Sequence, residues 1–113
     1  MSEQIPAAVA MLKKQSELLD VNLKLTRTEL NYPRSRERLA KWKAQTVLLI
    51  AQHLGPKEAK KFEVKQPGPS FTNDLLDELS DDQDVYRDFL EALARAIQKP
   101  GYVLEVEAGS TPA

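Results

Sequence analysis

The sequence predicts an all-α fold, a small helical bundle with an extended C-terminal arm. The bundle contains two long antiparallel helices, a third long helix and two short helices. Three observations predict this fold class. Apolar residues recur at helical spacing in three long segments, as expected for helices with a buried face. Proline and glycine stand between those segments, where helices end. The 113 residues suffice for one domain with its own core, and they include no cysteine.

The segment from Ser35 to Gly55 is predicted to be the central helix, with Ser35 as its N-cap. One side of its helical wheel, an arc of about 160°, carries the residues expected to face the core. They are Leu39, Trp42, Thr46, Val47, Leu49, Ile50, His53 and Leu54. Leu48 lies opposite, among basic and amide side chains. Gly55 and Pro56 end the helix, because proline cannot donate a backbone hydrogen bond into its continuation.

The first predicted helix, from Pro6 to about Leu30, carries two apolar stripes that lie roughly opposite each other on its wheel. The first stripe consists of Ile5, Val9, Leu12, Leu19, Leu23 and Leu30, and the second of Ala7, Met11, Leu18 and Leu25, with Val21 beside it. Two apolar faces need two partners. Either the bundle sandwiches this helix, or its second stripe meets another subunit, and the sequence leaves both alternatives open.

The turn at residues 31–33 is expected to fold the first two helices into a hairpin, because the residue before Pro33 avoids helical geometry. A short basic helix follows over 56–64, and a loop over 65–70. A further short helix is expected over 73–79. The predicted inward-facing residues of these two short helices are Ala59, Phe62, Val64, Leu75, Leu76 and Leu79.

Ser80 and Gln83 have the spacing of a capping box, which predicts that a new helix begins there and runs to about Lys99. Its inward-facing residues are expected to be Tyr86, Phe89, Leu90, Leu93 and Ile97. Residues 102–107 alternate like a strand but have no strand to pair with, so we expect an extended arm there. The predicted helical domain therefore covers residues 1–107, and residues 108–113 are predicted to be a flexible tail or linker.

The charges divide along the chain. The formal net charge is −1, yet residues 1–66 hold thirteen Lys and Arg against seven Asp and Glu, and residues 67–113 hold three against ten. Packing of the acidic helix near the basic one would neutralise this split within the fold. Head-to-tail association of copies would neutralise it between chains. We favour the first interpretation, neutralisation within the fold.

The composition argues against a metal site and against catalysis. With no cysteine and a single histidine, His53, on the core-facing arc, the chain offers no metal site, and no glycine-rich phosphate loop is present. We expect no cofactor and no enzymatic activity. The N-terminus has Glu3 where a signal peptide carries positive charge, and no stretch approaches the roughly 18 apolar residues that span a bilayer. We therefore expect no membrane partner and a cytoplasmic location.

The basic surface of the central helix has two possible functions. A single apolar residue within a basic and amide surface favours protein contact, which predicts the partner-binding residues Met11, Leu18, Leu25, Arg34, Arg38, Lys41 and Leu48. The alternative is an anion site for nucleic acid or a nucleotide-type ligand, formed by Arg34, Arg36, Arg38, Lys60 and Lys61. The acidic overall charge and the few aromatic residues weigh against nucleic acid as a partner.

The run from Glu37 to Phe62, with Trp42, Thr46 and Gly55 in it, resembles the helical N-terminal regions that precede TIR-like and other effector domains in bacterial abortive-infection (anti-phage) proteins. Residues 86–98 resemble the second long helix of those regions. The resemblance implies an adaptor or oligomerisation role and no catalytic residue. No effector domain is present in this chain.

These observations lead to three hypotheses. The first is a non-catalytic protein–protein interaction module that self-associates as a homo-oligomer or docks a protein partner. The second is a binder of nucleic acid or of an anionic nucleotide-type ligand. The third is a small inhibitor or immunity protein that uses the acidic face of the last helix.

Overall fold

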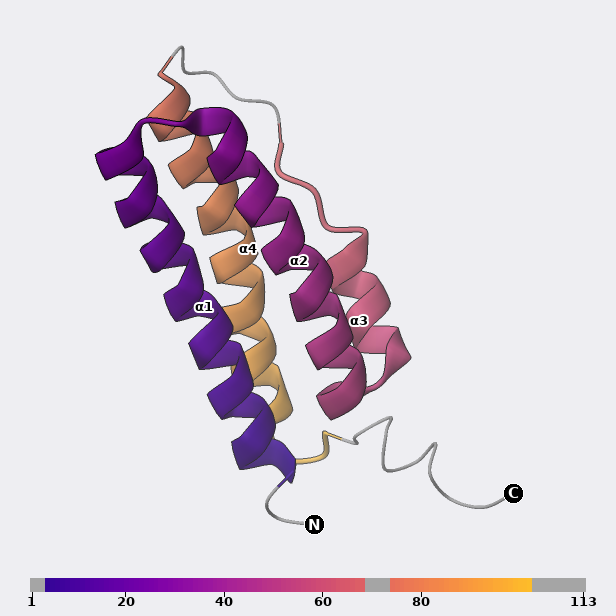
Figure 1. Ribbon diagram of the computed structural model, residues 1–113. Coiled ribbons are helices and arrows are strands. Elements are labelled where there is room, and N and C mark those ends of the chain that lie inside the picture. Colours follow the sequence, from indigo (N-terminus) through magenta and orange to yellow (C-terminus); the bar gives the residue numbers. More distant parts are fainter. Residues whose placement is uncertain (1–3, 69–73, 103–113) are drawn as a thin grey trace.

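The computed structural model describes residues 4–68 and 74–102 as four helices: α1 (Gln4–Glu29), α2 (Tyr32–Leu54), α3 (Pro56–Glu63) and α4 (Leu75–Ile97). Figure 1 shows the three long helices side by side, with the short α3 beside the C-terminal half of α2. α1 packs along both α2 and α4, whereas α2 and α4 touch each other little. The all-α helical bundle predicted from the sequence is therefore confirmed.

The connection between α1 and α2 is tighter than predicted. Leu30 has a φ of 55°, a left-handed conformation that is uncommon outside glycine, and it reverses the chain direction at once. The N-cap of α2 is Asn31, whose Oδ1 accepts from the backbone N–H of Arg34 at 3.1 Å. The prediction that Ser35 is the N-cap was wrong, because Ser35 is already inside α2, where its hydroxyl is buried and donates to the carbonyl of Asn31.

α4 begins earlier than predicted and runs without a break. Its N-cap is Asp74, whose Oδ1 accepts from the N–H groups of Leu76 and Asp77 at 2.8 and 3.1 Å. The separate helix over 73–79 and the capping box at Ser80 were wrong. Gln83 is 1% exposed in the core, so its side chain does not return to the N–H of Ser80.

The core follows most of the predicted arcs. The buried apolar residues of α2 are Leu39, Trp42, Ile50 and Leu54, and α4 buries Leu79, Tyr86, Leu90, Leu93 and Ile97. The rings of Trp42, Phe62 and Tyr86 form a three-way cluster with centroids 5.7–5.9 Å apart. Three predicted inward-facing residues are instead exposed: Leu30, Val64 and Leu75. Each stands at or just beyond the end of a helix, where no neighbouring helix covers it.

A polar seam joins α1 to α2. Gln15 donates to the hydroxyl of Thr46 at 2.7 Å, and the Trp42 indole N–H donates to the carbonyl of Gln15 at 2.9 Å. Further along, the hydroxyls of Thr26 and Ser35 are 2.5 Å apart. These buried groups satisfy one another, as most buried polar groups in proteins do.

The predicted arm over 102–107 and the tail over 108–113 fall outside the described residues, except for Tyr102. The hydroxyl of Tyr102 donates to a carboxylate oxygen of Glu58 in α3 at 3.0 Å.

Candidate functional site

The outer face of α1 carries an apolar row that no other described helix covers. We call it the α1 stripe and define it as Met11, Leu18, Val21 and Leu25. Leu18, Val21 and Leu25 are 38%, 49% and 43% exposed, and Met11 is half-buried. The opposite side of α1, with Ala8, Leu12 and Leu19, is fully buried against α2 and α4. No helix among the described residues covers the second stripe, so the alternative in which the bundle sandwiches α1 was wrong for this part of the chain.

Two of the basic residues predicted to bind a partner lie beside α1. Arg38 on α2 donates through Nε to Oδ1 of Asn22 at 2.7 Å and pairs with Glu29 at 3.1 Å. Arg34 lies 3.8 Å from the same carboxylate. The structure thus places these two arginines along the seam between α1 and α2.

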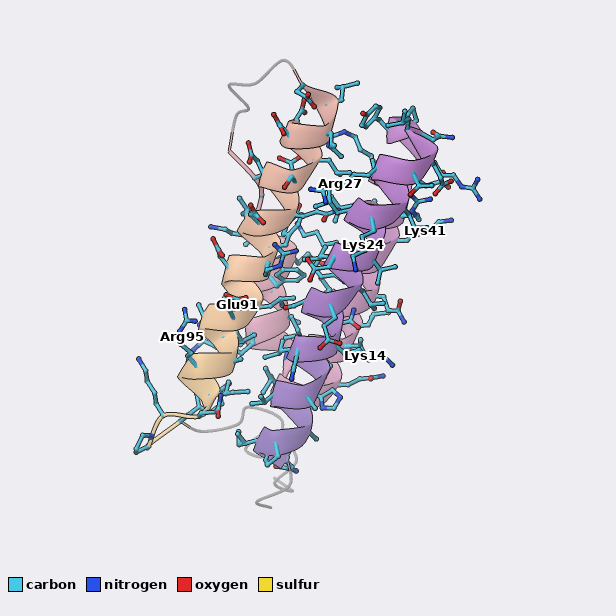
Figure 2. The ribbon with its side chains drawn as sticks, turned by 90° about the vertical axis from the view of Figure 1, so that its left-hand side faces the viewer. Lys14, Lys24, Arg27, Lys41, Glu91 and Arg95 are labelled. Atoms are coloured by element: carbon cyan, nitrogen blue, oxygen red, sulfur yellow. The ribbon has the colours of Figure 1, made fainter. Side chains whose placement is uncertain are left out.

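The other two predicted partner-binding residues of α2 are exposed. Lys41 pairs with Glu37 on its own helix. Figure 2 views the molecule from the α1 side and labels Lys41 together with Lys14 and Lys24 of α1. Leu48 is 65% exposed but belongs to a different surface, the groove between α2 and α4 described below.

The five residues of the predicted anion site do not converge. Arg36 reaches across to α4, where it pairs with Glu78 at 2.8 Å and Asp82 at 3.1 Å. On α3, Lys60 pairs with Glu63 at 3.2 Å and Lys61 with Glu58 at 3.1 Å. Arg34 and Arg38 share Glu29. Each of the five therefore has a carboxylate beside it.

The charge split is neutralised only in part within the fold. Arg36 links α2 to α4, and Arg87 on α4 pairs with Asp20 on α1 and with Asp84. The remaining acidic residues of α4 face outward and have no ion-pair partner in the described part of the chain. They are Asp77, Asp81, Asp88 and Glu91.

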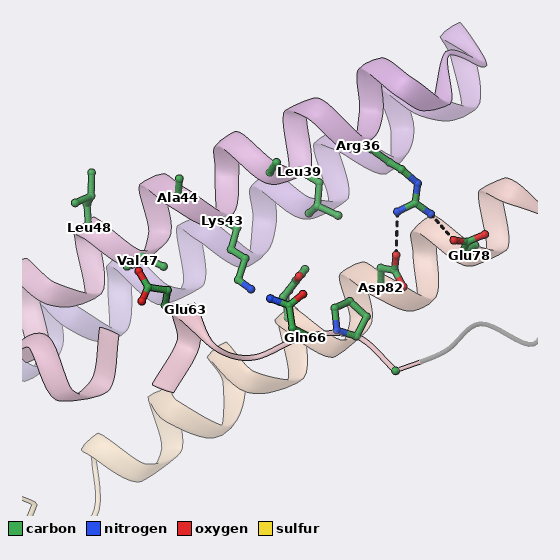
Figure 3. A pocket seen from close by; sticks show the side chains of 14 residues that line it. Arg36, Leu39, Lys43, Ala44, Val47, Leu48, Glu63, Gln66, Glu78 and Asp82 are labelled. Atoms are coloured by element: carbon green, nitrogen blue, oxygen red, sulfur yellow. Dashed lines mark hydrogen bonds and ion pairs between the residues drawn. The ribbon is translucent and has the colours of Figure 1, made fainter. Parts of the chain in front are cut away.

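A groove of about 920 Å³ opens between α2 and α4, beyond the end of α3. Figure 3 shows Leu39, Ala44 and Val47 along α2 on one side, with Asp82 and Glu78 on α4 across from them. The sequence did not predict this groove, because it is formed where three separate segments meet. The only signal was the row of small and apolar residues Ala40, Ala44 and Leu48 on the solvent side of α2.

Lys43 lies in this groove over aromatic rings. Its ammonium is 4.9 Å from the ring centroid of Tyr86, and it donates to the carbonyl of Lys65 at 2.5 Å. Burial lowers the pKa of Lys43, and the nearby charge of Glu63 partly opposes that shift. Burial also raises the pKa of Tyr86, and Asp82 adds to the effect.

Most of the charged groups that line the groove are paired with one another. An amine of lowered pKa becomes a catalyst when a partner group moves its proton or when it attacks a bound carbonyl. Of the three carboxylates that line the groove, Glu78 and Asp82 are held by Arg36, and Glu63 pairs with Lys60. No cluster of three or more metal-ligating side chains occurs among residues 4–68 and 74–102.

None of the helices in the described segments combines the length and apolar character needed to cross a bilayer. By its fold and its surfaces, the protein is a small all-α bundle whose α1 stripe no other described helix covers. No protein-family model, curated protein or solved structure matches the chain.

Proposed function

We propose that this protein is a non-catalytic interaction module that self-associates through the α1 stripe. The observation that carries the proposal is the continuous exposure of Leu18, Val21 and Leu25 over two helical turns. Isolated exposed apolar residues are ordinary on protein surfaces, but a row of them at helical spacing is typical of a contact surface. Covering this row would remove apolar side chains from water in the way that a further helix packed on α1 would.

The surroundings of the stripe support protein contact. Basic and acidic side chains flank it, among them Lys14, Glu17 and Lys24, as in a polar rim around an apolar centre. On the resemblance to abortive-infection proteins alone, we further propose that the module belongs to a bacterial anti-phage system. Its lack of cysteine fits a cytoplasmic setting.

Light scattering of the purified chain over a wide concentration range tests the proposal. We expect the mass to rise above the 12.7 kDa of one chain as concentration increases, at both low and high salt. Contact through apolar side chains persists in salt, whereas contact through exposed charges alone is screened.

Leu18→Asp should keep the chain monomeric without unfolding it, because Leu18 is partly exposed and a carboxylate there stays hydrated until a partner covers it. The matched control is Leu48→Asp, which makes the same chemical change on a different surface and should leave association intact. Circular dichroism and thermal melts check that both variants fold. A wild-type particle of one-chain mass at all concentrations would refute the proposal.

A further inference from the structure

Building on the proposed self-association, we propose that two copies pair through α1 in antiparallel orientation, with the twofold axis passing beside Val21. The occupant of the α1 stripe is therefore a second copy of the same stripe. The inference rests on how apolar and charged residues are arranged around Val21 on the exposed face of α1.

The two flanks of this face differ in chemistry. With Val21 as zero on the wheel, Leu18 and Leu25 lie at about +60° and +40°, on the flank toward α2, at 100° per residue. Glu17 and Lys24 lie at about −40° and −60°, on the flank toward α4. The contacts of neighbouring residues set these directions, because Asn22 bonds to Arg38 of α2 and Asp20 pairs with Arg87 of α4. Within residues 17–25, one flank is thus apolar and the other is charged.

The two flanks are also balanced about Val21 along the helix axis. Glu17 stands four residues before Val21 and Lys24 three residues after it, at axial distances of about 6 and 4.5 Å. Leu18 and Leu25 stand three before and four after, at about 4.5 and 6 Å. A twofold axis through Val21 that reverses the helix direction therefore brings Glu17 of one copy beside Lys24 of the other. The same operation brings Leu18 beside Leu25.

The pattern discriminates between orientations. A twofold axis perpendicular to antiparallel helices keeps each flank on its own side, so leucine meets leucine and each carboxylate meets an ammonium. A twofold axis parallel to the helices exchanges the flanks, so Glu17 and Lys24 would face Leu18 and Leu25. That arrangement would cover charges with apolar groups and leave them unpaired, which is costly.

Glu17 and Lys24 are free to make these contacts. Both are exposed, and neither has an ion-pair partner in the described part of the chain, unlike Asp20 and Glu29 on the same helix. Figure 2 labels Lys24 on α1, on the side of the molecule that faces the viewer. In the dimer, the two Glu17–Lys24 ion pairs would lie along one side of the apolar contact.

A single cysteine at Val21 tests the position of the axis. At interaxial distances of 8–10 Å, the two Cα atoms at this position would be about 3.5–5.5 Å apart, close to disulfide geometry. The chain has no cysteine of its own, so Val21→Cys introduces the only thiol. Under glutathione redox buffer we expect rapid formation of a covalent dimer. The matched control is Ala10→Cys on the same exposed face, whose copies would lie about 33 Å apart and should not cross-link.

Charge exchange tests the pairing of the flanks. Glu17→Lys and Lys24→Glu should each weaken the homodimer about tenfold, because each creates two like-charge contacts. The double variant should restore dimerisation, and an equimolar mixture of the two single variants should form a heterodimer in preference to either homodimer.

The outcomes separate this inference from the proposed function. Concentration-dependent dimers together with faster cross-linking at position 21 than at position 10 support both. Dimers without that preference, or without rescue by the double variant, would overturn the antiparallel pairing and leave self-association standing. A wild-type chain that stays monomeric would overturn both.

Discussion

Gln83 is a residue whose burial has no compensating hydrogen bond in the described part of the chain. It is 1% exposed, and neither its amide nitrogen nor its amide oxygen has a partner there. A buried amide without partners loses its hydration and gains nothing in return. At this position of α4, the polar side chain therefore opposes folding.

We expect Gln83→Met to raise the free energy of unfolding by about 1–2 kcal/mol, because methionine has a similar shape and no amide to desolvate. Urea denaturation followed by circular dichroism measures the change. Gln15→Met is the matched control, since Gln15 is equally buried but bonded to Thr46, and it should not gain stability. A Gln83→Met protein less stable than wild type would mean that the amide is satisfied in solution.

The buried residues separate what the sequence can predict from what it cannot. Trp42, Leu39 and Ile50 are buried as predicted, because helical periodicity alone identifies an apolar face. Gln15 and Thr26 were not predicted to be buried. The hydroxyl partner of Gln15 stands 31 residues away on α2, so its burial depends on tertiary structure that no local pattern contains.

At the level of the helix, the start of α4 rests on Asp74. We expect Asp74→Ala to cost about 0.5–2 kcal/mol, because it removes the acceptor for two N–H groups of the first turn. Ser80→Ala should lower the free energy of unfolding by less than about 0.5 kcal/mol, since alanine is the better helix former at an interior position. Thermal melts of the two variants compare them directly. Equal losses, or a larger loss at Ser80, would contradict the observed cap.

The helix boundaries show where local signals fail. The ends of α1, α2 and α3 lie within about three residues of their predicted positions, as expected when proline and glycine mark the ends. Ser80 and Gln83 match a capping box in sequence, but Leu79 and Tyr86 lie on one continuous buried face. That face favours a single helix, and tertiary packing outweighs the local cap.

Over the whole molecule, the two candidate surfaces differ in how far the sequence could predict them. The α1 stripe was predicted because all its residues belong to one helix. Its exposure was left open, because that depends on where α2 and α4 pack. The groove depends on α2, α4 and the segment after α3 together, so the sequence singled out Leu48 and Arg36 as candidate site residues without predicting the groove that both of them line. Surfaces formed by several elements require the fold before they can be recognised.

The distribution of charge over the whole fold bears on the second hypothesis, an anion binder. Nucleic-acid affinity comes largely from the release of counterions by cations that neutralise phosphates. Here Arg34, Arg36, Arg38, Lys60 and Lys61 all stand beside carboxylates, and they point from different sides of the bundle. A phosphate would have to displace those carboxylates, which remain nearby and repel it.

We therefore expect no saturable binding of a fluorescent single- or double-stranded oligonucleotide at physiological salt, measured by anisotropy. The variant Glu29→Gln provides the sharpest comparison, because replacing the carboxylate with an uncharged amide frees Arg34 and Arg38 together and should increase any weak binding at low salt. Tight binding by the wild-type chain that falls steeply with salt, and that Arg34→Ala or Arg38→Ala abolishes, would instead favour an anion site. In that case the carboxylates beside these arginines would serve to hold them in position rather than to neutralise them.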